Sequence, residues 1–212
     1  MSWLVDAVPR HERERVDSIL ALCTSVSLPA GSRLERDRVE TKSLLLIEEG
    51  IAVVSAPSAA RRPMVVAFAA PGSVLLAPTP HESLEALADL RVTLVAAGAK
   101  LQLLEIPAAA AVILDGVTDG LRDCQESLSH FASLRHADRV RHKLVQLARV
   151  HGKVGARNVS LDLPLTHELL ADMVGSTRET VTRTLSQLAR EGHVRHKRGW
   201  YQLAAPRDGF AS

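Results

Sequence analysis

Two arginines and a glutamate in the segment GSTRETVTRTL have the clearest chemical potential, because Arg178, Glu179 and Arg183 form the pattern R-E-x-x-x-R. The pattern leads us to expect these side chains on the polar face of a helix, with an aliphatic stripe that includes Leu185 on the other face. An arginine fork can bond O6 and N7 of guanine, and a carboxylate can accept from the cytosine amino group. The pattern predicts a helix that reads base edges in DNA. The alternative is an ordinary amphipathic helix with a solvated face.

The flanking residues predict the elements that hold this helix. Thr166 can cap a preceding helix, Gly175 permits the sharp reversal of a helix-turn-helix, and Ser176 to Glu179 form S-x-x-E, a capping box. After Gly192 the sequence predicts a basic β-hairpin, called the wing. The residues predicted to contact bases or phosphates are Thr166, Ser176, Thr177, Arg178, Glu179, Thr182, Arg183, His196, Lys197 and Arg198.

This segment resembles the recognition helix of the CRP/FNR superfamily of bacterial transcription regulators, in particular its catabolite-activator branch. The resemblance covers residues about 137 to 203 and is much weaker before them. It implies that Arg178 and Arg183 read guanines and that Glu179 reads a cytosine in TGTGA-like half-sites, whereas the FNR branch spaces its base-reading residues differently. It also implies a homodimer on a pseudo-palindrome, with double-stranded DNA and RNA polymerase as partners.

Charge is divided unevenly along the 212 residues, although the net charge is only +2. From Arg135 onward there are 14 Lys and Arg against 7 Asp and Glu, and before it 12 against 17. A basic module joined to an acidic one is typical of a protein that binds DNA at one end. No segment resembles a signal peptide, and no apolar run approaches the ~20 residues that cross a bilayer. The expected location is the cytoplasm, without a membrane partner.

The region from about residue 28 to 106 has short apolar runs separated by Gly and Pro, which predict the strands of an antiparallel roll or barrel. Strand pairs are expected around Glu48-Glu49-Gly50, around Pro71-Gly72 and around Gly98. EEGIAVV and APGSVLL resemble the cyclic-nucleotide-binding-type β-roll of the superfamily. Residues 2 to about 23 predict one or two short helices packed against this roll.

The ligand motif departs from the pattern of that superfamily. A cyclic-nucleotide site there needs a carboxylate for the ribose hydroxyl and an arginine, followed by serine, for the cyclic phosphate. After Pro71-Gly72 this chain continues with Ser73-Val74-Leu75-Leu76, and no serine follows Arg91. Glu82 and Glu85 follow an insertion-like loop. A conventional cAMP site is not expected, and the effector is unknown: another small molecule, or none.

No cofactor and no metal are predicted. An iron–sulfur cluster needs several neighbouring cysteines, and this chain has only Cys23 and Cys124. Haem needs an axial ligand, for which His81 is the only histidine in the roll. A cupin-type enzyme would carry several metal-binding histidines in its roll, and the chain offers no set of nucleophile, base and orienting residue. An enzyme is therefore not expected.

Residues 107 to about 135 predict one long helix with apolar positions spaced alternately by 3 and 4 over roughly three heptads. Such a narrow stripe favours a partner helix over packing on the chain's own roll, and the superfamily dimerises through this element. The predicted dimer interface consists of Leu114, Val117, Leu121, Cys124, Leu128 and Phe131.

The sequence thus predicts an α+β chain in three parts. Residues 1–108 form a β-roll sensory or effector-type domain with amino-terminal helices, 109–136 a dimerisation helix and hinge, and 137–212 a winged helix-turn-helix. The last part begins with a helix capped by Asp138 and a short strand pair in ARNVSLDLPL. The expected function is sequence-specific, homodimeric transcription regulation. Two alternatives remain open: a regulator that needs no effector, its roll being a scaffold, and a haem-based gas sensor.

Overall fold

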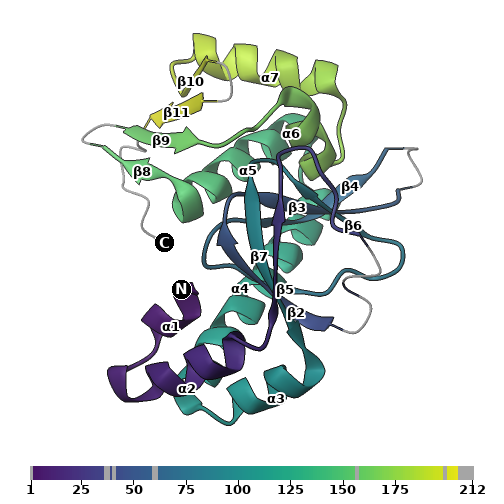
Figure 1. The fold of residues 1–212 in the computed structure, drawn as a ribbon. Helices are drawn as coiled ribbons and strands as arrows, with labels where there is room; N and C mark the ends of the chain where they lie inside the picture. The colour runs from purple at the N-terminus through teal and green to yellow at the C-terminus, as the bar shows by residue number, and fades with distance from the viewer. Residues whose placement is uncertain are drawn as a thin grey trace. The chain divides into compact units, whose positions relative to one another are not determined.

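The structure is a computed structural model that describes residues 2–35, 39, 42–58, 62–155, 158–197 and 200–204, leaving the side chains of Lys42, Ser43 and Lys197 undescribed. The chain forms two compact units (Figure 1). The amino-terminal unit comprises Met1–Arg61 and Val65–Glu126. The carboxy-terminal unit comprises Ser127–Ser212, and Arg62–Met64 is assigned to it as well.

The amino-terminal unit combines short helices with two antiparallel sheets. Its helices are α1 (Trp3–Ala7), α2 (Arg10–Leu20), α3 (Ala97–Leu104) and the first part of α4 (Pro107–Ser133). Its strands are β1 (Thr24–Leu28), β2 (Lys42–Glu49), β3 (Ala52–Ala56), β4 (Met64–Ala69), β5 (Val74–Leu76), β6 (Ser83–Ala86) and β7 (Leu90–Ala96). One sheet has the order β1-β7-β2-β5 and the other β4-β3-β6.

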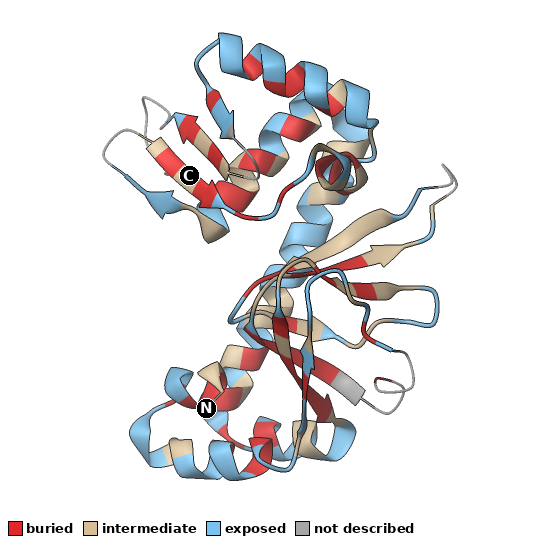
Figure 2. Ribbon diagram, turned by 45° about the horizontal axis from the view of Figure 1, so that its top comes forward, coloured by how far each residue is buried: buried red, intermediate tan, exposed pale blue. Residues whose placement is uncertain are grey.

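Strand β2 is apolar on both faces because it lies between two hydrophobic cores. Side chains alternate across a strand, so Leu44 and Leu46 pack with the helices while Leu45 and Ile47 join the core between the two sheets. All four are at most 4% exposed. Figure 2 shows the buried residues that line this region. Burial on both sides explains the continuous apolar run LLLI, which alternation with polar residues would otherwise interrupt.

A buried carboxylate attaches the amino-terminal helix to this sheet. Glu48, 7% exposed, accepts hydrogen bonds from the Ser2 hydroxyl at 2.7 Å, the Trp3 amide at 3.1 Å and the Thr93 hydroxyl at 2.9 Å. Ser2 is also the N-cap of α1, since its side chain accepts from the Leu4 amide. Because three donors satisfy the carboxylate, it can stay buried at the end of β2.

The strand pairs predicted for this unit are wrong, because the strands expected to pair with each other do not do so. β2 and β3, expected to pair around Gly50, belong to different sheets, as do β4 and β5 on either side of Gly72. Gly50 has φ +81°, and a Cβ there would lie 2.1 Å from the Asp89 carbonyl oxygen, so the chain turns a corner against the backbone at this point. The pair expected around Gly98 is instead β7 followed by α3, whose Ala, Leu, Lys and Gln residues favour a helix.

The carboxy-terminal unit contains the remaining elements. They are the end of α4, then α5 (His136–His151), β8 (Lys153–Val154), β9 (Asn158–Asp162), α6 (His167–Val174), α7 (Arg178–Arg190), β10 (Val194–Lys197) and β11 (Trp200–Ala204). The strands form one antiparallel sheet in the order β10-β11-β9-β8. α5 begins one turn earlier than predicted: its N-cap is Arg135, and Asp138 lies within the first turn.

The predicted α+β architecture is confirmed in its order: amino-terminal helices, antiparallel sheets, a long helix, and a helix-turn-helix followed by a β-hairpin. Within the described residues, no single helix is long and apolar enough to span a membrane. Only α3 and α4 together reach that length and composition, and they are bent by 116° at their junction.

Candidate nucleic-acid interface

Helix α7 separates a buried face from an exposed polar face, as its sequence predicts. Val181 and Leu185 are 0% and 4% exposed and pack inside the carboxy-terminal unit. Arg178, Glu179 and Arg183 are exposed. The aliphatic side fixes the rotation of the helix about its axis, so that Glu179 and Arg183 face solvent on the opposite side. Arg178 lies seven residues before Leu185 and is exposed as the first residue of α7. Figure 2 shows both buried and exposed residues along this helix.

The turn before α7 follows the predicted geometry, with its cap displaced by one residue. Gly175 has φ +56°, and a Cβ there would lie 2.5 Å from Phe131 Cε1, so both the backbone and the packing favour glycine. The N-cap of α7 is Thr177, whose hydroxyl accepts from the Thr180 amide at 3.2 Å, and not Ser176 as the capping box predicts. The Ser176 hydroxyl is buried and makes no hydrogen bond with the described residues.

Thr166 caps α6 as predicted, its hydroxyl accepting from the Leu169 amide at 3.0 Å. Both cap hydroxyls are thus occupied in holding the two helices. Glu179, in the first turn of α7, is fully exposed, and the pKa of its carboxyl lies below the usual range because its own backbone amide and the Thr177 hydroxyl bond to it. The Glu179 side chain therefore stays ionised and able to accept a hydrogen bond at neutral pH.

The wing follows α7 as an antiparallel hairpin of β10 and β11, with His196 opposite Tyr201 in the register. Arg195 and His196 are exposed. Arg198, predicted to contact phosphate, lies outside the described residues, as does the side chain of Lys197. The described part of the wing thus brings one predicted contact, His196, to the surface.

A histidine that the sequence did not single out joins the wing to α7. His167, the first residue of α6, places Nδ1 2.8 Å from the Thr182 hydroxyl oxygen, and its ring centroid lies 5.1 Å from that of His196. The His196 ring lies 4.5 Å from that of Tyr201, whose buried hydroxyl donates to the Leu165 carbonyl at 3.0 Å. Thr182 lies 15 residues away in the chain, so no local pattern could reveal this contact.

Burial, with the positive charges of His196 and Arg178 as smaller contributions, lowers the pKa of His167 below its ordinary 6.5. The folded unit therefore resists protonation that the unfolded chain accepts near pH 6.5. We expect stability to fall as the pH drops below 6.5 and to be unaffected by this group above it. His167→Asn should make the free energy of unfolding, measured in urea, depend less on pH between pH 7.5 and 5.5. The decrease in slope should correspond to fewer than one proton taken up per molecule on unfolding.

The two tryptophans allow this measurement to be assigned to one unit. A Trp3→Phe background leaves Trp200 to report on the carboxy-terminal unit, and a Trp200→Phe background leaves Trp3 to report on the other. The pH dependence of the Trp3 signal should not respond to His167→Asn. An unchanged pH dependence of the Trp200 signal would contradict the assignment.

Helix α4 carries an exposed aliphatic stripe, although not all of the six predicted interface residues lie on it. Leu114, Leu121 and Leu128, seven residues apart, are 64%, 57% and 59% exposed, and Cys124 between them is exposed as well. Val117 instead packs against the core between the helices and the first sheet. We call Leu114, Leu121, Cys124 and Leu128 the α4 stripe.

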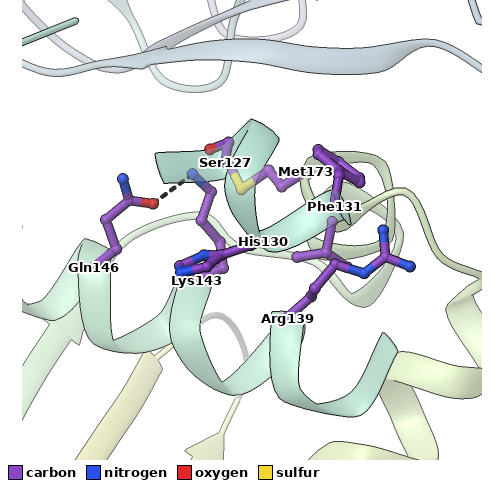
Figure 3. Close-up of a pocket in the computed structure, with 8 residues that line it drawn as sticks. Ser127, His130, Phe131, Arg139, Lys143, Gln146 and Met173 are labelled. Carbon is purple, nitrogen blue, oxygen red and sulfur yellow. Dashed lines mark hydrogen bonds between the residues drawn. The ribbon is translucent and has the colours of Figure 1, made fainter. Parts of the chain in front are cut away.

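Phe131, the sixth predicted interface residue, packs within the carboxy-terminal unit. Its ring contacts the turn at Gly175, and the Arg139 guanidinium lies 5.0 Å from the ring centroid. Figure 3 shows both side chains beside a small pocket where the end of α4 meets α5 and α6, with Lys143 donating to Gln146 at 2.7 Å. The side chain that ends the predicted heptads thus supports the helix-turn-helix.

The charged residues considered for a ligand site in the roll are engaged in protein contacts. The Arg91 guanidinium pairs with the Glu49 carboxylate, Glu85 pairs with Arg33 at 3.3 Å, and Glu82 accepts from the Thr79 amide at 2.7 Å. The core between the two sheets is built of aliphatic side chains, among them Leu45, Ile47, Leu84, Leu90 and Leu94, each at most 2% exposed. His81 is exposed, and no group of three or more metal-binding side chains occurs among the described residues.

Comparison with known proteins agrees with this geometry. A model of the Crp-like helix-turn-helix domain matches residues 138–207. The transcriptional regulator SdrP of Thermus thermophilus is 34% identical over 90 residues, which are 41% of this chain and 43% of SdrP. The chain thus matches about two fifths of the length of that curated relative.

Solved structures extend the likeness to nearly the whole chain. A mutant of CooA from Carboxydothermus hydrogenoformans superposes with a TM-score of 0.77 at 19% identity, covering 88% of this chain and 85% of that one. A transcriptional regulator of the CRP/FNR family from Thermus thermophilus superposes with a TM-score of 0.60 at 24% identity, covering 85% and 93%. At these identities the likeness establishes the fold, with the roll, long helix and helix-turn-helix in the same order.

Proposed function

This chain belongs to the CRP/FNR family of transcription regulators, and we propose that it is a homodimeric, sequence-specific DNA-binding regulator. The observation that carries the proposal is the exposure of all three side chains on α7: Glu179 and Arg183 lie opposite its buried aliphatic side, and Arg178 is its exposed first residue. A capped helix of this kind fits the major groove, where base edges are distinguishable.

The chemistry of these three side chains favours a TGTGA-like half-site. Arg178 and Arg183 each offer a bidentate fork to a guanine, and the ionised Glu179 can accept from a cytosine amino group. Thr166, Ser176, Thr177, His196, Lys197 and Arg198 are proposed to lie near phosphates, which position the protein without reading sequence. The excess of basic residues after Arg135 supports binding to a polyanion at this end of the chain.

The homodimer is proposed on the α4 stripe. Apolar side chains repeated every seven residues on an exposed helix are suited to a two-stranded coiled coil, and leaving three leucines more than half exposed is unfavourable for a monomer. Two copies would place recognition helices in successive major grooves, with half-site centres about 34 Å apart.

Cys124 provides a chemical test of this interface. In a parallel two-stranded coiled coil, the two Cys124 thiols face each other across the dimer axis, and an added oxidant such as copper phenanthroline can join them as a disulfide. We expect most of the protein to run at twice the monomer mass on a non-reducing gel. Cys124→Ser should abolish the doubled band and Cys23→Ser should retain it. The opposite dependence would contradict the proposed stripe.

For the amino-terminal unit we propose a scaffold role that needs no effector. The aliphatic core between the sheets, and the pairing of Arg91 and Glu85 with other side chains, give a cyclic nucleotide no evident charged partner among these residues. DNA affinity and melting temperature should then stay constant across a panel of small metabolites. The haem-sensor alternative predicts a Soret band in the absorption spectrum of the purified protein. RNA polymerase as a partner, a cytoplasmic location and the lack of enzyme activity remain expectations from the family.

The deciding experiment is selection of preferred duplexes from a random pool by the full chain, followed by affinity titrations at two salt concentrations. The proposal expects an inverted repeat of TGTGA-like half-sites and a binding constant that falls steeply as salt rises. Enrichment of no motif, together with equal affinity for unrelated duplexes, would overturn sequence-specific regulation.

A further inference from the structure

The hydroxyl of Thr182, on the exposed face of α7, is already occupied inside the protein. It donates to the Arg178 carbonyl at 2.8 Å, and it lies 2.8 Å from His167 Nδ1. A hydroxyl has one proton and a carbonyl can only accept, so the Thr182 proton belongs to the bond with Arg178. The bond with His167 must therefore run the other way, from Nδ1–H to the Thr182 oxygen.

This assignment fixes the tautomer of the neutral His167 ring. With its proton on Nδ1, the neutral ring has a bare Nε2, and Nε2 is buried without a hydrogen bond to the described residues. The His167 ring lies beside that of His196, which contacts Tyr201, and the Tyr201 hydroxyl donates to the Leu165 carbonyl. The donor that faces Thr182 is thus supported from α6 and from both strands of the wing.

We propose that Thr182 reads a thymine through its methyl group, and that His167 is the positioning residue that keeps the Thr182 hydroxyl turned away from the bases. The inference rests on the proposed function, since it concerns the same helix in the same groove. It adds a base preference that Arg178, Glu179 and Arg183 do not supply.

The chemistry of the major groove supports this choice. O6 and N7 of guanine and O4 of thymine need a donor, and Thr182 has no free proton to give. What remains for the groove is its γ-methyl group and one oxygen lone pair. The thymine methyl offers an apolar contact, and the adenine of the same pair offers an amino group. An A·T pair with its methyl toward Thr182 therefore fits best, and the methyl contact is the part that can be tested alone.

The test uses the full chain and its selected duplex, with deoxyuridine replacing each thymine of the half-site in turn, because this exchange removes only the methyl group. At one position we expect this exchange to weaken binding of the duplex about fourfold when it is made in one half-site and about fifteenfold when it is made in both. This is the loss expected when one methyl-sized group per half-site is no longer buried from water. At that position a cytosine duplex should bind more weakly than a 5-methylcytosine duplex by the same factor.

Four variants separate the two residues and their roles. The measured quantity is the affinity for the thymine duplex divided by the affinity for the deoxyuridine duplex, which we call the ratio. Thr182→Val keeps a methyl group and should keep this ratio, whereas Thr182→Ser keeps only the hydroxyl and should bring the ratio to one. His167→Ala should reduce the ratio toward one, and His167→Asn, which restores an N–H donor, should recover it. Ser186→Ala is the matched control, since its hydroxyl bonds the Thr182 carbonyl on the same face and should leave the ratio unchanged.

The outcomes distinguish this inference from the proposed function. Specific, salt-dependent binding with equal affinity for thymine and deoxyuridine at every position would overturn the methyl readout and leave the regulator intact. A ratio that responds to Thr182→Ser and not to His167→Ala would overturn the positioning role of His167 alone. Failure to bind any duplex specifically would remove the proposed function itself.

Discussion

Replacing Arg178 or Arg183 by alanine is expected to weaken binding to the preferred half-site by ~1–3 kcal/mol, or about 5- to 150-fold, and to relax the preference at one base pair. The loss follows from the geometry of α7, on which both guanidinium-bearing residues are exposed to solvent. In the proposed complex each fork would satisfy two acceptors of one guanine, and alanine would leave both acceptors without that donor. On a symmetric duplex the loss counts once in each half-site.

Two basic residues serve as controls in the same titrations. Arg190→Ala removes an exposed arginine from the last turn of α7, away from the R-E-x-x-x-R pattern, and Lys197→Ala removes a charge from the wing. Both should weaken all duplexes about equally, and Lys197→Ala should lower the dependence of affinity on salt by about one phosphate contact. If all four variants lost affinity equally on cognate and substituted half-sites, the proposed base-reading roles would be wrong.

The parts of the fold that depend on local interactions could be predicted from the sequence. Thr166 caps α6, Gly175 takes the left-handed conformation, and α7 has its apolar residues on one side because each feature is set by residues three or four apart. The cap of α7 shows the limit of such signals. Ser176 and Thr177 are both good caps, and the structure uses the second.

The parts that depend on distant contacts could not be predicted. Gly50 marks a turn in the sequence, but whether the strands beside it pair or enter different sheets depends on β6 and β7, which begin 33 and 40 residues later. His167 likewise has no distinguishing pattern around it, since its partners come from α7 and the wing. The a/d spacing of α4 identified an exposed stripe and could not tell that Val117 and Phe131 would be taken by the chain's own core.

A glutamate in place of Leu121, at the centre of the α4 stripe, is expected to yield a monomer and to lower the affinity for a palindromic duplex by about 10²- to 10⁴-fold. In the proposed dimer the two copies of residue 121 face each other, so the change buries two like charges against each other and removes the central apolar contact. A dimer binds its second half-site as an intramolecular event, and a monomer loses that advantage. Sedimentation and duplex titration measure the two effects separately.

Leu22→Glu is the matched control, because Leu22 is 84% exposed in the same unit and lies outside the stripe. It should leave both the dimer and the DNA affinity unchanged. Leu121→Lys should also be monomeric, whereas an equimolar mixture of the Leu121→Glu and Leu121→Lys chains should recover a dimer, since opposite charges then meet across the seam. Recovery in the mixture would show that both variants fold and fail only in pairing. A Leu121→Glu protein that stays dimeric and binds DNA normally would place the dimer interface elsewhere than on α4.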